Sequence, residues 1–349
     1  MRHFDELTER GRIDRLRALG ATELDRYDVR PRAMKHIRRA ENVTFDVRAS
    51  KPRGRGGPGA PYVPGRYLLR LHRPGYHTVQ AIRSEMEWLI ALRRDLDLHV
   101  PDPVFARDGS LTVYAEDEGV PDGRVCTLLR WMRGSTRTEE TASPGHLRMV
   151  GRMMARLHDH SSTWDRPEGF VRGRWDWYGL FETGGTAGTD DSWVWDDLPK
   201  TARKLCEPAA RETADAIEQL GEGEEAFGLI HADLHLGNVI FGRGEARAID
   251  FDDCGDGHWL YDMAVALFDH RSKDDWEIWR DALLEGYAEV RDLPAGIDPY
   301  LETFMCARCV SLLLWVRARA REDPRFRRNM REWTAGLVRY LKEHCSHDD

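Results

Sequence analysis

The chain has 349 residues, of which 41% are hydrophobic and 32% charged, so it is globular rather than disordered and longer than one compact core usually requires. Its net charge is -8 and its pI about 6.0, whereas nucleic-acid-binding proteins usually have a basic balance. The longest apolar run, VSLLLWV, is far below the roughly 18 to 20 residues of a membrane span. These properties predict two domains, with no nucleic-acid partner and no membrane span.

Cysteine usage and the first residues bear on the cellular compartment. Charged residues rather than an apolar signal core follow Met1, and the six cysteines are scattered. Cys306 and Cys309 form a CxxC within the helix-like stretch FMCARCVSLLLWV, which we interpret as packed thiols on a helix. The sequence therefore predicts a reduced, cytoplasmic protein.

The first third of the chain is rich in strand signals. Residues 1–20 have apolar side chains at helical spacing, which predicts an N-terminal helix ending at Gly20. HIRRAENVTFDVRAS predicts two strands around a turn, YLLRLH another strand, and HTVQAIRSEMEWLIALRRDL an amphipathic helix. The basic segment 51–66 is rich in Gly and Pro but lacks the GxxxxGK[ST] order, so we interpret it as a mobile hairpin loop, with a phosphate cradle as the alternative.

Helical signals dominate the rest. LTVYAEDEG and RVCTLLRWM predict a hairpin, the pattern breaks at 131–136, and HLRMVGRMMARLH predicts a long helix. Strands that come first and helices that come second indicate an α+β protein with two lobes. We expect an N-lobe over 1–132 and a C-lobe over 133–349.

The segment HADLHLGN, residues 231–238, carries the densest chemistry. A short strand precedes it, and NVIF, a tight turn and ARAID follow, so a hairpin should bring Asp250 back close to Asn238. Amide and carboxylate oxygens of this kind suit Mg²⁺. Asp233 on the same loop is placed to orient a hydroxyl and accept its proton while the metal holds phosphate.

Two other interpretations of this loop stay open. His231, Asp233 and His235 are possible zinc ligands, which would make the chain a metal hydrolase of the HxDxH kind, although no second histidine cluster accompanies them. The loop is otherwise a polar turn without chemistry.

HADLHLGNVIF and AIDFDDCGDGHWLYDMAVAL resemble the catalytic and metal-binding segments of the aminoglycoside phosphotransferase and choline kinase superfamily. RRAENVTFDV and YLLRLHRPGYHTVQAIRSEMEWLIAL resemble the nucleotide-covering strands and the following helix of its branch with stress response kinase A and homoserine-kinase-like proteins. The resemblance runs from about residue 30 to 270. It implies a two-lobed protein-kinase-like fold with ATP and Mg²⁺ as cofactors.

The same resemblance assigns roles to residues of the C-lobe. Asp233 would be the catalytic base or hydroxyl-orienting group, and Asn238 and Asp250 would hold Mg²⁺. His231 would complete the catalytic loop by bracing it. Asp262 would anchor the loop backbone from the start of a helix.

In the N-lobe the resemblance implies an ion pair between Arg70 and Glu85 near the nucleotide. Arg70 stands where protein kinases have lysine, and its planar guanidinium binds phosphate oxygens with a different reach. Glu85 taken alone reads as a solvated helix residue. Asn42 lies in a turn without the GxGxxG pattern and would help to cover phosphate through backbone N–H groups.

The acceptor is not specified by these motifs. Four tryptophans are candidates for an aromatic wall of the acceptor pocket, with core packing as the alternative; they are Trp175, Trp177, Trp193 and Trp195. We expect a small-molecule acceptor that is aminoglycoside-, amino-alcohol- or sugar-like. The alternatives are a protein Ser/Thr kinase of the stress-response type and the metal hydrolase.

Overall fold

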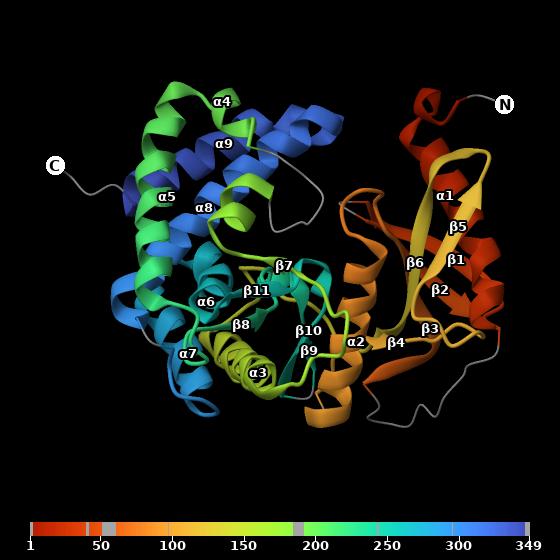
Figure 1. The fold of residues 1–349 in the computed structure, drawn as a ribbon, viewed down its shortest axis with the longest axis horizontal. Coiled ribbons are helices and arrows are strands. Elements are labelled where there is room, and N and C mark those ends of the chain that lie inside the picture. Colours follow the sequence, from red (N-terminus) through yellow and green to blue (C-terminus); the bar gives the residue numbers. More distant parts are fainter. Residues whose placement is uncertain are drawn as a thin grey trace. The chain divides into compact units, whose positions relative to one another are not determined.

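The computed structural model describes residues 3–39, 42–50, 61–96, 98–183, 192–242, 244–294 and 296–345. Its contacts divide the chain into two compact units (Figure 1). The first comprises Met1–Ser135 and Pro167–Val171, and the second Thr136–Arg166 and Arg172–Asp349. The predicted boundary after residue 132 falls just before this division, and the segment 167–171 returns to the first unit.

One antiparallel sheet forms the centre of the first unit. Its strands follow the order β1-β2-β3-β6-β4, and β5 pairs with β6. The predicted strands, the predicted hairpin and the predicted amphipathic helix are confirmed. The elements are η1 (Phe4–Glu6), α1 (Glu9–Glu23), η2 (Leu24–Tyr27), β1 (Pro31–Arg39), β2 (Val43–Ala49), β3 (Tyr62–Leu71), α2 (Val79–Leu96), β4 (Asp102–Pro103), β5 (Val113–Asp117) and β6 (Val120–Met132).

Helix α1 packs its apolar side against this sheet, where Leu16 and Leu19 join a buried cluster with Phe45 and Leu69. The predicted end of the helix at Gly20 is wrong, because α1 continues to Glu23. A Cβ at Gly20 would lie 2.9 Å from Leu69 Cδ2. The glycine therefore serves close packing of the helix on β3 rather than helix termination. Residues 51–60 of the predicted loop 51–66 lie outside the described residues, and the prediction is wrong for 62–66, which belong to β3.

The second unit is mainly helical, as predicted. Its small sheets pair β9 with β10 and align β7-β11-β8. The elements are α3 (Pro144–Thr163), β7 (Gly173–Arg174), η3 (Gly179–Thr183), α4 (Val194–Asp197), α5 (Lys200–Leu220), β8 (Phe227–Ile230), η4 (Leu236–Asn238), β9 (Val239–Gly242), β10 (Glu245–Ala248), η5 (Phe251–Asp253), β11 (Gly255–His258), α6 (Trp259–Leu267), η6 (Phe268–His270), α7 (Trp276–Ala288), α8 (Ile297–Glu322) and α9 (Pro324–His344). The α+β class is thus confirmed.

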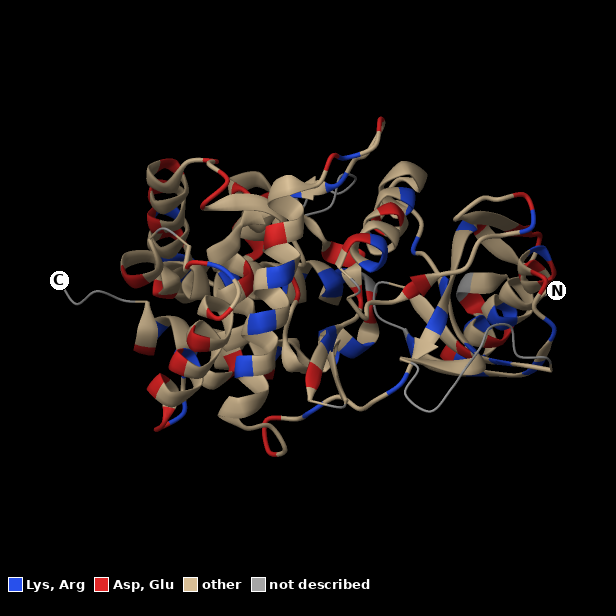
Figure 2. Cartoon of the chain, turned by 90° about the horizontal axis from the view of Figure 1, so that it is seen from below, with Lys and Arg blue, Asp and Glu red and all other residues tan. Residues whose placement is uncertain are grey.

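Two helix groups organise the second unit. Helices α5, α8 and α9 lie side by side (Figure 1), and α3 packs closely along α7. Acidic and basic residues are interspersed along the ribbon in the view of Figure 2. None of the described helices is long and apolar enough to cross a membrane.

The cysteine prediction needs a correction. Cys309 is a buried free thiol on α8, as expected, but Cys306 forms a disulfide with Cys345 just after α9. Cys345 lies outside the CxxC and 39 residues from Cys306, so local spacing gave no indication of the pair. The expectation of fully reduced cysteines is therefore wrong for this pair.

Candidate active site

The loop after β8 and the hairpin that follows have the predicted geometry. Strands β9 and β10 pair antiparallel, with Val239 opposite Ala248. The N–H of Ile249 donates to the carbonyl oxygen of Asn238 over 2.9 Å. Asp250, which follows, has a left-handed backbone with φ of 65°. The hairpin therefore brings Asn238 and Asp250 to the same end of the β9–β10 ladder.

Asp262 fixes the start of the catalytic loop from the first turn of α6. This aspartate is fully buried, and its carboxylate accepts hydrogen bonds from the N–H groups of His231 (2.9 Å) and Ala232 (2.7 Å). His158 of α3 contacts the same carboxylate through Nε2 at 3.1 Å. A buried carboxylate needs such donors, and here they are loop amides. The anchoring expected of Asp262 is confirmed.

His231 is enclosed by the loop rather than presented to solvent. Its side chain is fully buried, Nδ1 accepts from the N–H of Asp233 at 3.3 Å, and Nε2 donates to the carbonyl of Ile249 at 3.0 Å. These contacts link the loop to the far strand of the hairpin. They support a bracing role, while a direct catalytic role for His231 stays a prediction.

Asp233 is held by three side chains. Its Oδ2 accepts from the Asn238 amide at 2.9 Å, its Oδ1 accepts from Arg308 Nη2 at 2.5 Å, and His235 Nε2 lies 3.5 Å from Oδ2. The Asn238 amide also donates to the Asp233 carbonyl at 3.0 Å. The carboxylate is thereby fixed in direction, as a group that orients a reacting hydroxyl must be.

The charges around Asp233 set its protonation. Burial by itself raises the pKa of this carboxyl, but the charge of Arg308, with His235 and His231, outweighs burial and holds that pKa well below its usual range. Burial likewise lowers the pKa of His235, and the hydrogen bond and charge of Asp233 outweigh it and raise that pKa. Asp233 is therefore an anion at neutral pH.

Arg308 is the residue of this site that sequence reasoning missed. It comes from the middle of α8, 75 residues after Asp233, and its side chain is 13% exposed. No motif marks it, because one arginine in FMCARCVSLLLWV reads as a polar position on an apolar helix. A polar residue at the centre of such a helix is the only signal that pointed to it.

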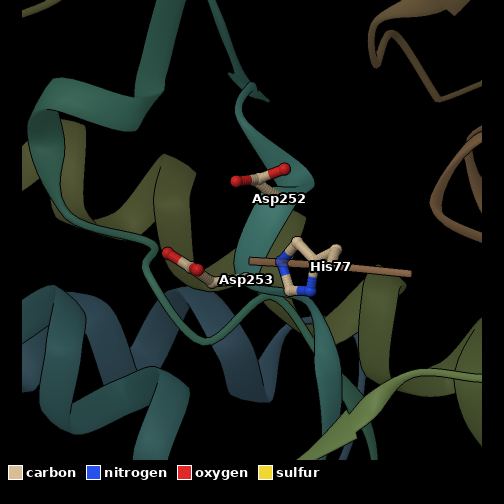
Figure 3. Close-up of side chains that lie close together, drawn as sticks. All are labelled: His77, Asp252 and Asp253. Carbon is tan, nitrogen blue, oxygen red and sulfur yellow. The ribbon is translucent and has the colours of Figure 1, made fainter. Parts of the chain in front are cut away.

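The donor set of Asn238 and Asp250 fits a hard divalent cation. The Asn238 amide nitrogen is turned to Asp233, which leaves its carbonyl oxygen as the atom for a ligand on the opposite side. Asp252 and Asp253 project from the turn that follows Asp250 (Figure 3). Oxygen ligands of these types are those that Mg²⁺ prefers.

Two residues of the segment around β7 hold the backbone of this acidic turn through hydrogen bonds to its carbonyl oxygens. Arg172 is buried and donates through Nε to the carbonyl of Cys254 at 2.6 Å and through Nη2 to that of Asp252. The Trp175 indole donates to the carbonyl of Asp253 at 2.9 Å and stacks on Tyr261. Trp175 is only 5% exposed, so its contacts support the core interpretation.

The other tryptophans differ from Trp175. Trp177 is 37% exposed, and Trp195 donates to the carbonyl of Phe181 at 2.9 Å. Trp193 carries the guanidinium of Arg321 over its ring at 4.1 Å. Trp177 and Trp195 both lie edge-on to Phe181, whereas Trp175 contacts the acidic turn. A role of Trp177, Trp193 and Trp195 in the acceptor pocket stays a prediction.

The predicted nucleotide residues belong to the first unit. Arg70 of β3 donates to both oxygens of Glu85 of α2, at 2.8 and 2.9 Å, and both side chains are buried. The pairing is confirmed, and the interpretation of Glu85 as a solvated residue is wrong. Asn42 accepts the N–H of Arg73 at 3.0 Å, which ties the turn before β2 to the end of β3. Their contact with nucleotide stays a prediction.

The zinc interpretation fits the loop poorly. Both ring nitrogens of His231 are engaged in hydrogen bonds to the backbone, so neither is left as a metal ligand. His235 Nδ1 accepts the N–H of Gly237 at 3.1 Å. Among the residues placed in the structure, the ligand atoms of His231, Asp233 and His235 do not gather within 4.8 Å of one another. The geometry therefore favours phosphoryl transfer over a zinc hydrolase.

Comparison with known families decides between these classes. The model of the phosphotransferase enzyme family matches residues 55–300, well over half of the chain. The chain belongs to this family. It is a phosphotransferase of the kinase class that acts on a hydroxyl group, and the expected resemblance is confirmed.

Individual relatives of this phosphotransferase act on different molecules. Homoserine kinase of Pseudomonas aeruginosa (strain LESB58) is 30% identical over 256 residues, which cover 72% of this chain and 73% of the relative. Stress response kinase A of Salmonella paratyphi A is 23% identical over 274 residues, 78% of this chain and 76% of the relative. The solved microcompartment-associated aminopropanol kinase is 28% identical with a TM-score of 0.74, covering 94% of this chain and 98% of that one. The protein-kinase-like fold is confirmed by this likeness.

Proposed function

We propose that the enzyme transfers the γ-phosphate of ATP, with Mg²⁺, to the hydroxyl of a small molecule. The observation that carries this proposal is the placement of Asp233. Its carboxylate is held between Asn238 and Arg308 on a loop anchored by Asp262. Asn238 in turn shares one end of the β9–β10 ladder with Asp250. This arrangement matches what phosphoryl transfer asks of a protein, which is positioning and charge.

Asp233 would orient the acceptor hydroxyl and take its proton. The new bond forms between the acceptor oxygen and the γ-phosphorus, and the bond from that phosphorus to the β–γ bridging oxygen breaks, so ADP leaves with the electron pair. Because the pKa of Asp233 is held low, proton transfer would come late, after the hydroxyl oxygen begins to bond to phosphorus. Asn238 and Asp250 would hold Mg²⁺, which when bound neutralises phosphate charge.

Residues of the first unit would hold the nucleotide. The buried pair of Arg70 and Glu85 keeps the guanidinium fixed, and Asn42 orders the turn before β2, where backbone N–H groups would cover phosphate. The relatives named for homoserine and aminopropanol support a small acceptor carrying a hydroxyl and an amine. We expect the enzyme to work in the cytoplasm.

Replacing Asp233 by asparagine tests the proposal. Asp233→Asn keeps the size of the side chain and removes its charge and basicity, so we expect turnover to fall about 10² to 10⁴-fold. The affinity for ATP should hardly change, because Asp233 contacts loop and helix side chains rather than the predicted nucleotide residues. ADP release with a pooled set of alcohols, amino alcohols and amino acids gives turnover, and calorimetric titration gives ATP affinity.

A matched control is Asp323→Asn, which removes the charge of another aspartate paired with an arginine. Asp323 caps α9 and pairs with Arg325 at 2.6 Å, and asparagine caps helices equally well. This control should keep full turnover. Turnover of Asp233→Asn close to the wild type would overturn the proposal, and a large loss of ATP binding would make Asp233 a metal-binding or structural residue. Transfer of labelled phosphate to added protein, and to none of the small molecules, would favour the protein kinase.

A further inference from the structure

Arg308 lies against the proposed catalytic carboxylate but belongs to no part of the catalytic loop. Helix α8 packs on α6, and Arg308 is partly buried there next to Tyr261 of α6, one turn before Ser311 of its own helix. Its Nη2 reaches Asp233 Oδ1 at 2.5 Å. The guanidinium therefore lies against the carboxylate that an acceptor hydroxyl would approach.

Arg308 has more N–H donors than its interactions with Asp233 and Tyr261 require. A guanidinium offers several N–H donors in a planar fork and can bind two oxygens of a carboxylate together. In the part of the chain that the structure describes, Asp233 is the one carboxylate within ion-pairing distance of Arg308, and it engages a single nitrogen. The Arg308 side chain keeps 13% of its surface exposed, so it is not fully enclosed by protein atoms.

The charge of Arg308 also changes what the site attracts. A carboxylate standing alone at Asp233 would draw cationic acceptors, but a permanent cation 2.5 Å away cancels most of that field. A polycation would meet the guanidinium as its hydroxyl approached Asp233, and like charges at this distance repel. An acceptor with a negative group near its hydroxyl would instead satisfy Asp233 and Arg308 together.

We propose that Arg308 determines acceptor specificity by binding a carboxylate of the acceptor, so that the substrate is a small hydroxy acid or hydroxy amino acid. This rests on the proposed function, because it takes Asp233 as the group that receives the hydroxyl. The acceptor places its hydroxyl at Asp233 and its carboxylate at the outer edge of the guanidinium. Arg308 itself takes no proton and forms no bond to phosphorus.

Matched pairs of acceptors that differ only in the carboxylate test this assignment. L-Homoserine is compared with 3-aminopropan-1-ol, and L-serine with ethanolamine, by ADP release above the hydrolysis background. For the wild type, kcat/KM should be at least about 10-fold higher for a carboxylate acceptor than for its amino alcohol, in line with a charged hydrogen bond. If no carboxylate acceptor exceeds its amino alcohol, the proposal is overturned.

Variants of Arg308 separate specificity from structure. Arg308→Gln removes a contact that fixes Asp233, so turnover should fall with both acceptors, but KM for the carboxylate acceptor should rise about 10- to 100-fold more than KM for its amino alcohol, so that the preference for the carboxylate is lost. Arg308→Lys, which keeps the charge and loses the fork, should restore part of the preference. Equal losses on both members of a pair would mean that Arg308 only orients Asp233, and would overturn the assignment.

The control is Arg317→Gln on the same helix. Arg317 pairs with Asp197 at 2.8 Å and is 11% exposed, so it matches Arg308 in burial and pairing without touching the catalytic loop. It should keep the wild-type preference. Calorimetric titration of L-homoserine gives a readout without turnover: binding should weaken in Arg308→Gln and stay unchanged in Arg317→Gln. Absence of both ATP binding and ADP release in the wild type would instead reject the proposed function itself.

Discussion

At the scale of single residues, burial and neighbouring charges decide the protonation of Asp233 and His158 in the second unit. Asp233 stays ionised although it is largely enclosed, because Arg308 and His235 stand within 2.5 and 3.5 Å of its oxygens. His158, fully buried, lies between Asp262 and the hydroxyl of Tyr287, and burial lowers its pKa more than Asp262 raises it. A neutral His158 thus donates to a charged Asp262, which in turn holds the loop.

His270 has no such partner, which makes it a source of acid sensitivity. The ring is fully buried, stacks on Trp279 with centroids 4.4 Å apart, and neither ring nitrogen has a hydrogen-bond partner among the described residues. Burial first, and then the charge of Lys273, lower the pKa of His270 to about 4, with Asp275 acting in the opposite direction. The folded state therefore resists protonation of this ring.

The sign of the effect on stability follows from linkage. Between pH 6.5 and about 4 the unfolded chain binds a proton at His270 and the folded chain does not, so the free energy of unfolding falls as the pH falls through this window. The loss is at most about 3 kcal/mol. We expect His270→Phe to flatten the dependence of urea unfolding on pH between 6.5 and 4. If the free energies of unfolding of His270→Phe and the wild type differed by the same amount at every pH, the substitution would affect packing alone and the prediction would be contradicted.

At the scale of elements, two glycines set the distance between α3 and α7. A Cβ at Gly286 would overlap the carbonyl oxygen of Arg148, and one at Gly151 would overlap that of Leu283. The helices approach until backbone meets backbone, and this brings Tyr287 of α7 to His158 of α3 at 2.9 Å. His158 in turn contacts Asp262, whose carboxylate binds the backbone of the catalytic loop. The close packing of α3 on α7 therefore helps to hold this loop in place.

Gly286→Ala should therefore destabilise the enzyme although alanine favours helices. Backbone atoms cannot move aside as a side-chain end does, so we expect a loss of about 1 to 3 kcal/mol in the free energy of unfolding. Gly145→Ala in the first turn of α3 is the control, because its nearest atom would be Ser143 Oγ at 3.7 Å. Chemical denaturation of both variants measures the difference, and a Gly286→Ala enzyme as stable as the control would show that the helices have room to separate.

At the scale of the whole molecule, the C-terminal helix is tied to the helix that carries Arg308. The disulfide between Cys306 and Cys345 joins α8 to the residue that follows α9. Cys306 lies two residues before Arg308 on α8. A bond across 39 residues restricts the unfolded chain, and in the chain-entropy model such a loop contributes about 3 to 4 kcal/mol. The stability of the enzyme should therefore depend on redox conditions.

The melting temperature should fall when reductant is added to the wild-type enzyme. Cys345→Ser should melt at the temperature of the reduced enzyme and lose its response to reductant, while Cys206→Ser, which alters a buried free thiol of α5, should keep the response. Calorimetry with and without reductant measures both. A wild type whose melting temperature ignores reductant after verified reduction would show that the bond contributes no stability.

The sequence by itself determined the elements and the chemistry that depend on short spacing. Alternation and helical periodicity placed the strands of the first unit and helices α2 and α3, and the hairpin after HADLHLGN predicted that Asp250 returns to Asn238. These features are local, because turn residues and side-chain periods act over a few positions. The resemblance added the pairing of Arg70 with Glu85 and the anchoring by Asp262, both of which the structure contains.

Only the tertiary structure decided which distant residues meet at the loop. Arg308 reaches Asp233 across 75 residues, Arg172 reaches the acidic turn across 80 and 82, and Cys345 reaches Cys306 across 39. Gly20 was misread as a helix end because its role depends on Leu69 of β3, which no local pattern contains. Such contacts are set by how helices and strands pack, so a side chain that reads as an ordinary polar position becomes part of the site when packing buries it beside a charge.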